Sequence, residues 1–586
     1  MKKNKKALQK ADAAKNEREM SGSLDDMVIG FVRRFSFPSQ SARHVAISCA
    51  ILLSAVTFLF LVPFVGKAYH IDDPLFLWAA KHIQVAPFDP YGFGINWYGQ
   101  EEPMWDVMKN PPLVSYYLAI VSLFFGWGEV AIHLAMMIPA VGVIIGTYTI
   151  ARRLCEQPIQ AAMACLATPV FIVSSTTVMS DIPMLSLWVW SVGLWIKGLD
   201  DDRPAWLAFS ALLMALAALT KYYGIALVPL LLVYSLAKKR SAGIWALYFL
   251  VPITALAAYQ WHTAGLYGSG LLTAAANFPA MSLSEHYTNS IKVLTGLAFV
   301  GGCIAVGLFY APFVWERMYL LGGGFLTLLA IASLSLFDTI GGFPLQDSSG
   351  IRFLIIVQFS IFLVAGIGIL ILALIDVREH RDAASLLILL WIAGTFVFAS
   401  LINWTVNARS ILPMVPAVAI LIARRMDSRR ERTPLRRRIQ ASWALVPAAF
   451  LALLAGYADL TSADSGRASA MEIRKYERAA HPIWFQGHWG FQYYMDLMGA
   501  KPVDPKQTRH QRGDIVAIPG NNTHTIPVNP RYFVLREEIE IQTCRYLATM
   551  NDAVGAGFYS NVKGPLPYAF GHVPPEKYRI WSLVGY

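Results

Sequence analysis

Stretches of about 18 or more apolar residues recur along most of this chain, and they constrain its fold more than any other feature. Each is long enough to cross a bilayer as a helix, and in lipid only helices and closed barrels satisfy every backbone hydrogen-bonding group. The composition agrees, because 56% of the residues are hydrophobic and only 15% are charged. The sequence therefore predicts an all-α protein that crosses a membrane many times.

We expect about thirteen transmembrane helices. Their predicted positions are 44–66, 129–150, 158–176, 182–198, 204–220, 222–238, 243–262, 291–312, 317–337, 353–376, 384–402, 409–424 and 440–459. Residues 1–43 are polar and basic, and we expect a mostly disordered cytoplasmic tail there. They do not resemble a signal peptide, so the first apolar stretch should remain as an anchor.

The net charge of +11 lies mainly in this tail and in short loops between apolar stretches, which argues against a nucleic-acid partner. The segment 112–126 is apolar but short. If it does not cross the membrane, six successive basic loops face the cytoplasm, as the positive-inside rule requires. These loops hold Arg152 and Arg153, Lys197 and Arg203, Lys238 to Arg240, Arg317, Arg378 and Arg381, and the arginines between Arg424 and Arg438. We therefore predict that 112–126 is a juxtamembrane helix on the outer face.

Three segments are then extracytoplasmic: the loop 67–128, the connection 263–290 and the tail 460–586. The connection is long enough to be a candidate lid. The tail has short strand-like runs between Pro, Gly and Asn turns, so we expect a small α/β domain after a membrane domain at 44–459. An aromatic-rich run at 484–494 could stack on sugars, but packing inside this domain is the favoured reading.

Seven charged residues lie at the outer ends of the spans or in outer loops: Asp72, Asp73, Asp181, Lys221, Lys292, Arg352 and Arg409. Asp181 could cap its helix as readily as serve a site. The lysines could extend to the outer headgroups, and a structural role is favoured for Lys292. Arg352 and Arg409 open helices, where a positive charge opposes the helix dipole, and this favours an anionic partner for them.

Adjacent carboxylates beside a membrane are costly, which points to a function for Asp72 and Asp73. A carboxylate can accept a proton from an attacking hydroxyl, and a Lys or Arg can neutralise a departing phosphate. The pattern predicts an acid–base reaction on an anionic lipid-linked substrate. His262 and His286 alone do not make a metal site, so no metal ligand is predicted, and a divalent metal is left open as a cofactor.

Five short motifs occur in order: Ile71–Phe76 (IDDPLF), Lys109–Leu113 (KNPPL) with Tyr116 and Tyr117, Ser180–Pro183 (SDIP), Leu219–Lys221 (LTK) and Arg409–Pro413 (RSILP). In this order they resemble the motifs of the GT-C glycosyltransferases. Over roughly 44–459 the chain is similar to the protein O-mannosyltransferases and the aminoarabinose lipid A transferases. The resemblance implies a GT-C fold.

The resemblance also implies an inverting sugar transfer from a polyprenyl-phosphate donor to a lipid, glycan or protein acceptor. Asp72 would be the general base, and Asp73 would assist or orient it. The donor phosphate would be bound by Lys221, Arg409 and, more weakly, Arg352. The sugar or acceptor would be contacted by Asp181, Asn110, Tyr116 and Glu102, although a solvated loop surface is favoured for Glu101, Glu102 and Asp106.

Two departures from the family pattern leave the sugar and the acceptor open. Asn110 stands where relatives often carry His or Lys, and Ser410 replaces a common aromatic residue. A lipid-linked sugar flippase or transporter and a surface-polysaccharide polymerase or ligase are the alternative functions. Transporters place ionisable groups near the bilayer midplane, whereas the charges here gather at one face. The basic loops and the disulfide-poor outer domain favour a bacterial inner membrane.

Overall fold

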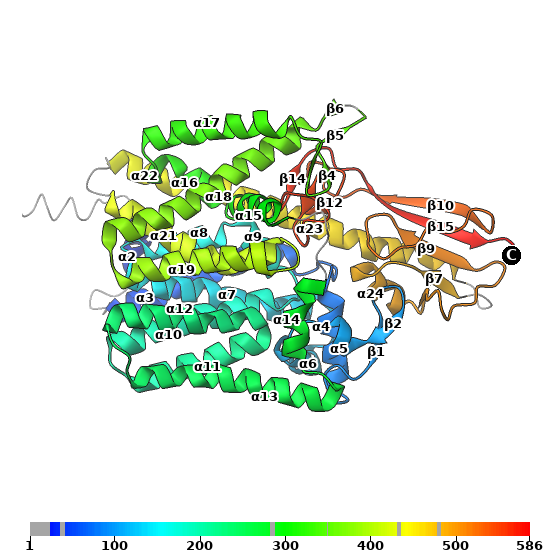
Figure 1. The fold of residues 1–586 in the computed structure, drawn as a ribbon, viewed down its shortest axis with the longest axis horizontal. Coiled ribbons are helices and arrows are strands. Elements are labelled where there is room, and N and C mark those ends of the chain that lie inside the picture. The colour runs from blue at the N-terminus through cyan, green and yellow to red at the C-terminus, as the bar shows by residue number, and fades with distance from the viewer. Residues whose placement is uncertain are drawn as a thin grey trace, which may run out of the picture.

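The computed structural model describes residues 24–34, 42–281, 288–348, 350–429, 435–477 and 482–585. A bundle of long helices forms one part of the molecule, and a smaller part built around a β-sheet projects from one end of it (Figure 1). The chain is a mostly helical, multi-pass membrane protein with a small C-terminal sheet domain. This is the predicted fold class.

Eight helices among the described residues are long and apolar enough to cross a membrane, and ten segments qualify if each of two bent pairs is one span. The eight contain α3 (Ala42–Leu61), α7 (Glu129–Leu154), α10 (Asp181–Asp200), α13 (Leu250–Tyr267), α17 (Arg317–Leu334), α18 (Phe353–His380), α19 (Ala383–Val397) and α23 (Leu445–Ile473). The bent pairs are α8 (Pro158–Leu166) with α9 (Pro169–Ser175), at 65°, and α15 (Asn289–Cys303) with α16 (Val306–Val314), at 82°.

The other three predicted spans are helical, but each continuous α-helix in them has fewer than 18 residues. They correspond to α11 (Pro204–Thr220), α12 (Leu227–Lys239), and α20 (Ala408–Ile411) continued by α21 (Val415–Ser428). A 3-10 turn at Tyr222–Ala226 precedes α12, and another at Leu412–Met414 separates α20 from α21. Regular α-helix is therefore interrupted at both places, next to two of the predicted site residues.

The loop 67–128 folds into short elements at one end of the bundle (Figure 1). They are α4 (Asp73–Ile83), β1 (Gly94–Asn96), β2 (Glu101–Pro103), α5 (Met104–Val107) and α6 (Leu113–Phe125). The 13 residues of α6 pack against α4 and are too few to cross a bilayer. α14 (Leu271–Met281) lies in the connection 263–290, and His286 is outside the described residues.

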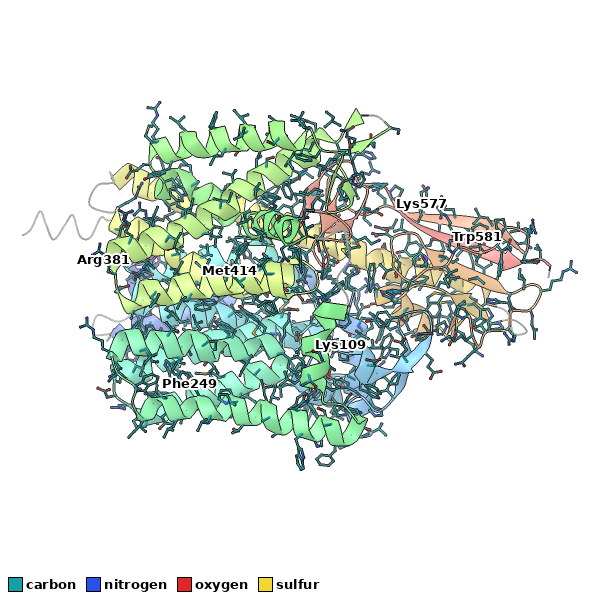
Figure 2. All side chains as sticks on the ribbon, viewed as in Figure 1. Lys109, Phe249, Arg381, Met414, Lys577 and Trp581 are labelled. Atoms are coloured by element: carbon teal, nitrogen blue, oxygen red, sulfur yellow. The ribbon has the colours of Figure 1, made fainter. Side chains whose placement is uncertain are left out.

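Basic residues of the predicted cytoplasmic loops gather at the opposite end. Arg381 lies at the end of the bundle away from the sheet domain, whereas Lys109 lies near that domain (Figure 2). Arg153 and Lys238 both pair with Asp200, at 3.0 and 2.8 Å. Sequence-distant loops thus share one basic end, as the charge pattern predicts.

Part of the segment 1–43 is described, and that part is helical. Residues Leu24–Arg34 form a helix, α2, and its Asp25 accepts hydrogen bonds from the backbone N–H groups of Ile159 and Gln160, at 2.8 and 3.1 Å. Apolar side chains of α2, including Val28 and Ile29, pack on the bundle. Tertiary contact rather than local composition orders this segment. Residues 1–23 and 35–41 lie outside the described residues.

The C-terminal part is a five-stranded sheet of order β10 (Phe533–Ile541), β15 (Glu576–Leu583), β9 (Ile515–Pro519), β7 (Ile483–Phe485) and β8 (Lys501–Pro502). β7 is parallel to its two neighbours, and the remaining pairs are antiparallel. α24 (Trp489–Leu497) packs on α23, which continues past the predicted domain boundary at 459/460. The aromatic-rich run packs, because Phe485 and Phe491 are buried in this domain's core.

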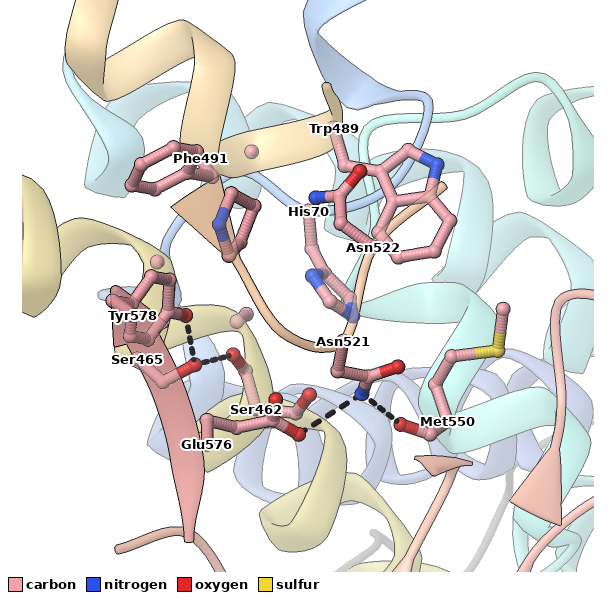
Figure 3. A pocket seen from close by; sticks show the side chains of 14 residues that line it. His70, Ser462, Ser465, Trp489, Phe491, Asn521, Asn522, Met550, Glu576 and Tyr578 are labelled. Carbon is pink, nitrogen blue, oxygen red and sulfur yellow. Dashed lines mark hydrogen bonds between the residues drawn. The ribbon is translucent and has the colours of Figure 1, made fainter. Parts of the chain in front are cut away.

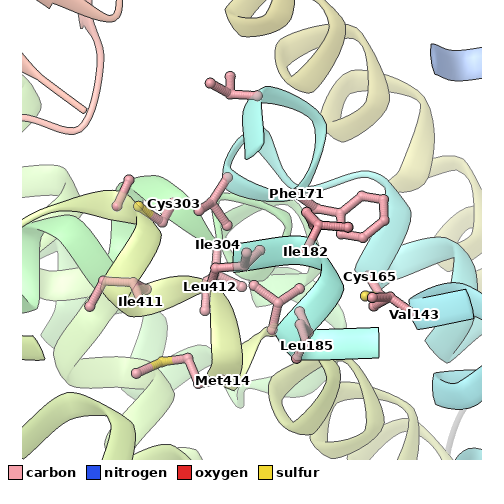
Figure 4. Close-up of a cluster of buried hydrophobic side chains, with 14 of the residues drawn as sticks. Val143, Cys165, Phe171, Ile182, Leu185, Cys303, Ile304, Ile411, Leu412 and Met414 are labelled. Atoms are coloured by element: carbon pink, nitrogen blue, oxygen red, sulfur yellow. The ribbon is translucent and has the colours of Figure 1, made fainter. Parts of the chain in front are cut away.

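Helices from distant parts of the chain meet in a buried apolar cluster (Figure 4). It contains side chains of α7, α8, α9, α10, α15 and the 411–414 segment. Ile182 and Ile411 are buried in it, each next to or close to a charged residue, Asp181 and Arg409 respectively. The packed core therefore fixes the positions from which these charges project.

Candidate active site

Asp72 and Asp73 stand side by side at the start of α4 but point to different surroundings. Asp72 lines a large cavity, whereas Asp73 is fully buried. The two oxygens of Asp73 accept hydrogen bonds from the backbone N–H groups of His70 and Val178, both at 2.8 Å. Ile71 has a positive φ of 46°, a strained backbone for a β-branched residue. This local bend separates the directions of the two carboxylates.

Asp181 is the first residue of α10, and the residue at the cap position is Ser180. Its carboxylate instead pairs with Lys221 at 2.5 Å and approaches Arg409 at 3.9 Å. Of the two readings left open by the sequence, the capping role is therefore not observed. Asp181 is 2% exposed, and burial strengthens its ion pairs because the local dielectric is low.

Lys221 and Arg409 both lie where regular helix stops. Lys221 sits between α11 and the 3-10 turn, in extended backbone conformation. Arg409 is in the four-residue α20, whose start is capped by the Asn407 side chain. The guanidinium of Arg409 donates to Asp72 at 3.0 Å. The four charges thus alternate in sign in the order Asp72, Arg409, Asp181, Lys221.

These four side chains line a cavity of about 620 Å³. Its walls come from the loop 67–128, from α14 and from the segments around 222 and 403–410. Aromatic rings of Trp97, Tyr98, Phe278 and Trp404 line it, together with the predicted contact residue Asn110. The cavity therefore combines a compact charged cluster with apolar, ring-bearing walls, which is the usual character of a site for an organic ligand.

A second, mainly apolar cavity of about 220 Å³ shares lining residues with the first. Tyr223, Ala226 and Gly394 line both. The second cavity extends between α10, α12 and α19, where Trp188 and Trp391 form part of its wall. Apolar space thus leads from the charged cluster into the helical bundle.

Besides the buried Asp73, three of the predicted site residues do not line the large cavity: Arg352, Tyr116 and Glu102. Arg352 bonds to the Pro344 carbonyl at 3.2 Å and to the Ala553 carbonyl, and it pairs with Asp347 at 3.8 Å. Tyr116 donates to the Pro87 carbonyl at 2.6 Å, and Glu102 accepts from Gln100 at 2.6 Å. Lys292, for which a structural role was favoured, donates to the Asn403 carbonyl at 2.7 Å.

Sequence reasoning missed a second group of charged residues beside the site. Lys67 and Asp459 form a completely buried ion pair. The hydroxyls of Thr549 and Tyr559 also donate to Asp459, both at 2.8 Å. A carboxylate at the end of the last predicted span could have signalled this pair. Nothing local pointed to Tyr559, which comes from the C-terminal part of the chain.

A small pocket lies nearby, between α23 and the C-terminal sheet (Figure 3). His70, Asn521 and Glu576 line it, and the Asn521 amide donates to Glu576 at 3.0 Å. Its volume of about 30 Å³ is room for a water molecule and excludes a sugar. No group of three or more His, Cys, Asp or Glu side chains suited to a metal ion occurs in the described part of the chain.

Comparison with protein families identifies one match. Residues 109–261, which are 153 of the 586 residues, match the sequence model of the family described as dolichyl-phosphate-mannose-protein mannosyltransferase. This segment contains the KNPPL, SDIP and LTK motifs and so confirms the resemblance to that group. No curated protein sequence matches the chain significantly.

Several solved structures are similar to this chain. An oligosaccharyltransferase from Archaeoglobus fulgidus in the apo form matches with TM-score 0.47 and 12% identity, over 79% of this chain and 65% of that one. This chain therefore spans less than two thirds of that relative's length. ArnT from Cupriavidus metallidurans, bound to undecaprenyl phosphate, matches with TM-score 0.42 and 16% identity, over 80% of this chain and 93% of that one.

A third structure, the archaeal oligosaccharyltransferase AglB from Archaeoglobus fulgidus with an inhibitory peptide and a dolichol-phosphate, gives TM-score 0.49 and 12% identity. It covers 81% of this chain and 69% of that one. At such scores and identities the matched structures indicate no reaction or substrate for this chain. The motifs and the family match lead to one statement: this is a multi-pass membrane protein that resembles the GT-C glycosyltransferases.

Proposed function

We propose that this protein is a membrane glycosyltransferase that transfers a sugar from a polyprenyl-phosphate donor to an acceptor on the outer side of the membrane, with inversion. One observation carries the proposal. Asp72 and the two cations Lys221 and Arg409 line the same cavity at the end of the bundle that carries the sheet domain. A proton acceptor and a phosphate-binding pair thus lie within reach of one bound substrate.

The reaction follows from this arrangement. An acceptor hydroxyl attacks the anomeric carbon of the donor and forms the new glycosidic bond, while Asp72 takes the hydroxyl proton. The bond between the anomeric carbon and the phosphate oxygen breaks, and the polyprenyl phosphate leaves with both electrons. Lys221 and Arg409 neutralise the charge that develops on that phosphate. A single displacement of this kind inverts the anomeric configuration.

The donor has a charged phosphate and an apolar isoprenoid chain, and the two cavities offer a charged lining and an apolar lining. Its phosphate would lie by Lys221 and Arg409, and its isoprenoid chain would follow the apolar cavity past Trp188 and Trp391. The matched family's description names a dolichyl-phosphate sugar as donor and a protein as acceptor. That description supports a lipid-phosphate donor here and leaves protein, lipid A, glycolipid and polysaccharide acceptors as candidates.

We further propose a bacterial inner membrane location with a cytoplasmic N-terminus and the C-terminal domain outside. The clustering of basic loops at the end of the bundle away from the sheet domain supports this orientation. Asp181 would then hold Lys221 and Arg409 in place at the outer end, through the ion pairs described above.

The test is mass spectrometry of lipid-linked sugars in cells that lack the protein. A transferase of this kind leaves its polyprenyl-phosphate sugar unused, so that lipid should accumulate and the glycosylated acceptor should disappear. Restoring the wild-type gene should reverse both changes, whereas an Asp72→Asn gene should reverse neither. If Asp72→Asn restores the product, the proposed reaction is wrong, and a flippase that needs no proton acceptor becomes the better explanation.

A further inference from the structure

The C-terminal domain contacts the active-site residue Arg409 directly. The ring of Tyr559 lies next to the guanidinium of Arg409, with 5.7 Å between the guanidinium carbon and the ring centroid. Tyr559 is buried, at 3% exposure. A guanidinium over an aromatic face is attracted by the ring's negative charge density, and the contact also limits the planes that the guanidinium can adopt.

The hydroxyl group of Tyr559 is also fixed, by a hydrogen bond. It donates to the buried carboxylate of Asp459, which is paired with Lys67. Lys67 lies five residues before Asp72 in the same outer loop. Tyr559 therefore bridges two groups, the loop that carries Asp72 and the side chain of Arg409, and it cannot turn away without breaking the bond to Asp459.

The backbone that carries Arg409 is also bound to this domain. The N–H of Ala408 donates to the Phe558 carbonyl at 2.8 Å, and the N–H of Asn561 donates to the Val406 carbonyl at 2.9 Å. The Asn561 side-chain oxygen accepts from the N–H of Val406 at 3.0 Å and from the Thr405 hydroxyl at 2.5 Å. Segment 405–408, immediately before Arg409, is thus paired with segment 558–561.

Arg409 needs such support because its own helix supplies little. α20 has four residues, and among the described residues the Nε of Arg409 has no hydrogen-bond partner. Its two terminal nitrogens approach Asp72 and Asp181, which draw the guanidinium toward two carboxylates and away from a bound phosphate. The Tyr559 ring restricts the guanidinium without competing for its hydrogen-bond donors.

We propose that the C-terminal domain is part of the active site, with Tyr559 as the positioning residue for Arg409 and Asn561 as the residue that fixes the backbone before it. This inference rests on the proposed function, in which Arg409 binds the donor phosphate. The domain then does more than cover the bundle, because removing one of its rings lowers the affinity for the phosphate end of the donor.

The test measures binding of undecaprenyl phosphate to the purified full-length protein, together with donor KM and kcat. Tyr559→Leu removes the ring and should weaken binding and raise the donor KM about tenfold. Tyr559→Phe keeps the ring and loses only the bond to Asp459, so it should bind within about threefold of wild type. Tyr546→Leu is the matched control, since Tyr546 belongs to the same domain and is 72% exposed.

A double-mutant cycle separates positioning from general stability. If Tyr559 acts through Arg409, then Tyr559→Leu should have no further effect on binding in an Arg409→Ala background. Additive losses in that cycle, or an unchanged affinity in Tyr559→Leu, would overturn the proposal. Asn561→Ala, which leaves the ring in place, is the second variant if Tyr559→Leu does not accumulate, and it should also weaken binding. Unchanged affinity in Asn561→Ala would count against the proposal in the same way.

The two proposals fail differently. If the wild-type protein does not bind undecaprenyl phosphate, the proposed function is wrong. If wild type binds it and Arg409→Ala weakens binding while Tyr559→Leu does not, only the role of the C-terminal domain is wrong.

Discussion

A carboxylate oxygen of Asp73 accepts a hydrogen bond from the backbone N–H of Val178, which is 105 residues further along the chain, at 2.8 Å. The other oxygen binds the N–H of His70. Asp73 thereby ties the loop of Asp72 to the loop that leads into α10 and Asp181. Burial raises the pKa of Asp73 to about 7, while Lys67 and the two N–H donors act in the opposite direction. The second acid of the pair thus links two loops that line the cavity.

Replacing Asp72 by Asn should lower kcat by about 10²- to 10⁴-fold, because the proton acceptor is lost. Asp72 lines the cavity, and the side-chain oxygen of Asn can still accept from Arg409, so the amount of protein in the membrane and its melting temperature should stay close to wild type. Turnover of a polyprenyl-phosphate sugar by the purified variant measures this. Glu101→Gln, an exposed acid in the same loop, should behave as wild type. Normal turnover by Asp72→Asn would remove Asp72 as the base.

Replacing Asp73 by Asn should give a different pattern. Its amide nitrogen cannot accept from either backbone N–H, so one buried donor loses its partner, at a cost of about 1–3 kcal/mol in stability. We expect a lower melting temperature in detergent together with reduced turnover. A variant with normal stability and no activity would show that Asp73 acts in the chemistry itself.

Removing either cation should weaken binding of polyprenyl phosphate. Lys221→Ala and Arg409→Ala each lose a charge-assisted contact, and we expect affinity to fall roughly 10- to 100-fold. Lys238→Ala removes a lysine that pairs with Asp200 and does not line the cavity, and it should leave binding unchanged. Titration with a fluorescent polyprenyl phosphate would measure all three. Unaltered affinity in both cavity variants would contradict the assigned role.

The stability of the C-terminal domain should depend on pH through His488. Burial lowers the pKa of His488 to about 3, and the neighbouring His524 and Lys563 act in the same direction. The unfolded state binds a proton near pH 6.5, so the stabilising effect of neutral His488 is complete above that pH and is lost as pH falls toward 3. The loss is at most about 1.4 kcal/mol per pH unit.

The comparison variant is His488→Phe, which keeps an aromatic ring against Trp97 and does not titrate. Wild type should lose melting temperature relative to this variant between pH 6.5 and 5. Other titrating groups contribute equally to both proteins. Parallel melting curves over this range would show that His488 is not kept neutral by burial.

The proposed orientation predicts the result of cysteine labelling. Single cysteines at Phe88 and Asp202, two exposed positions at opposite ends of the bundle, should react from opposite sides of the membrane. Position 88 should be labelled from outside. The five native cysteines are buried or half-buried and should react slowly. Labelling of both positions from one side would refute the topology, and with it the extracytoplasmic reaction.

Much of the architecture depends on residues that are close in sequence, so it could be predicted. Apolar stretches become helices because each must satisfy its own backbone hydrogen bonds in lipid, and the charged loops between them divide into a basic end and a mixed end. The charged residues of the site could also be identified from their sequence neighbours. Each of Asp72, Asp181, Lys221 and Arg409 interrupts or borders an apolar stretch, where a charge without a function would be costly.

Only the packed structure decided which of these charges share a cavity. Arg409 meets Asp72 across 337 residues of chain, and no sequence window contains that contact. The same packing turned Asp73 away from Asp72, kept Arg352 in contacts outside the cavity, and brought Tyr559 to Arg409. Sequence patterns specify where a helix begins and what surrounds it, because those depend on neighbours along the chain. Ion pairs between distant segments depend on how whole helices pack, and the tertiary structure alone determines them.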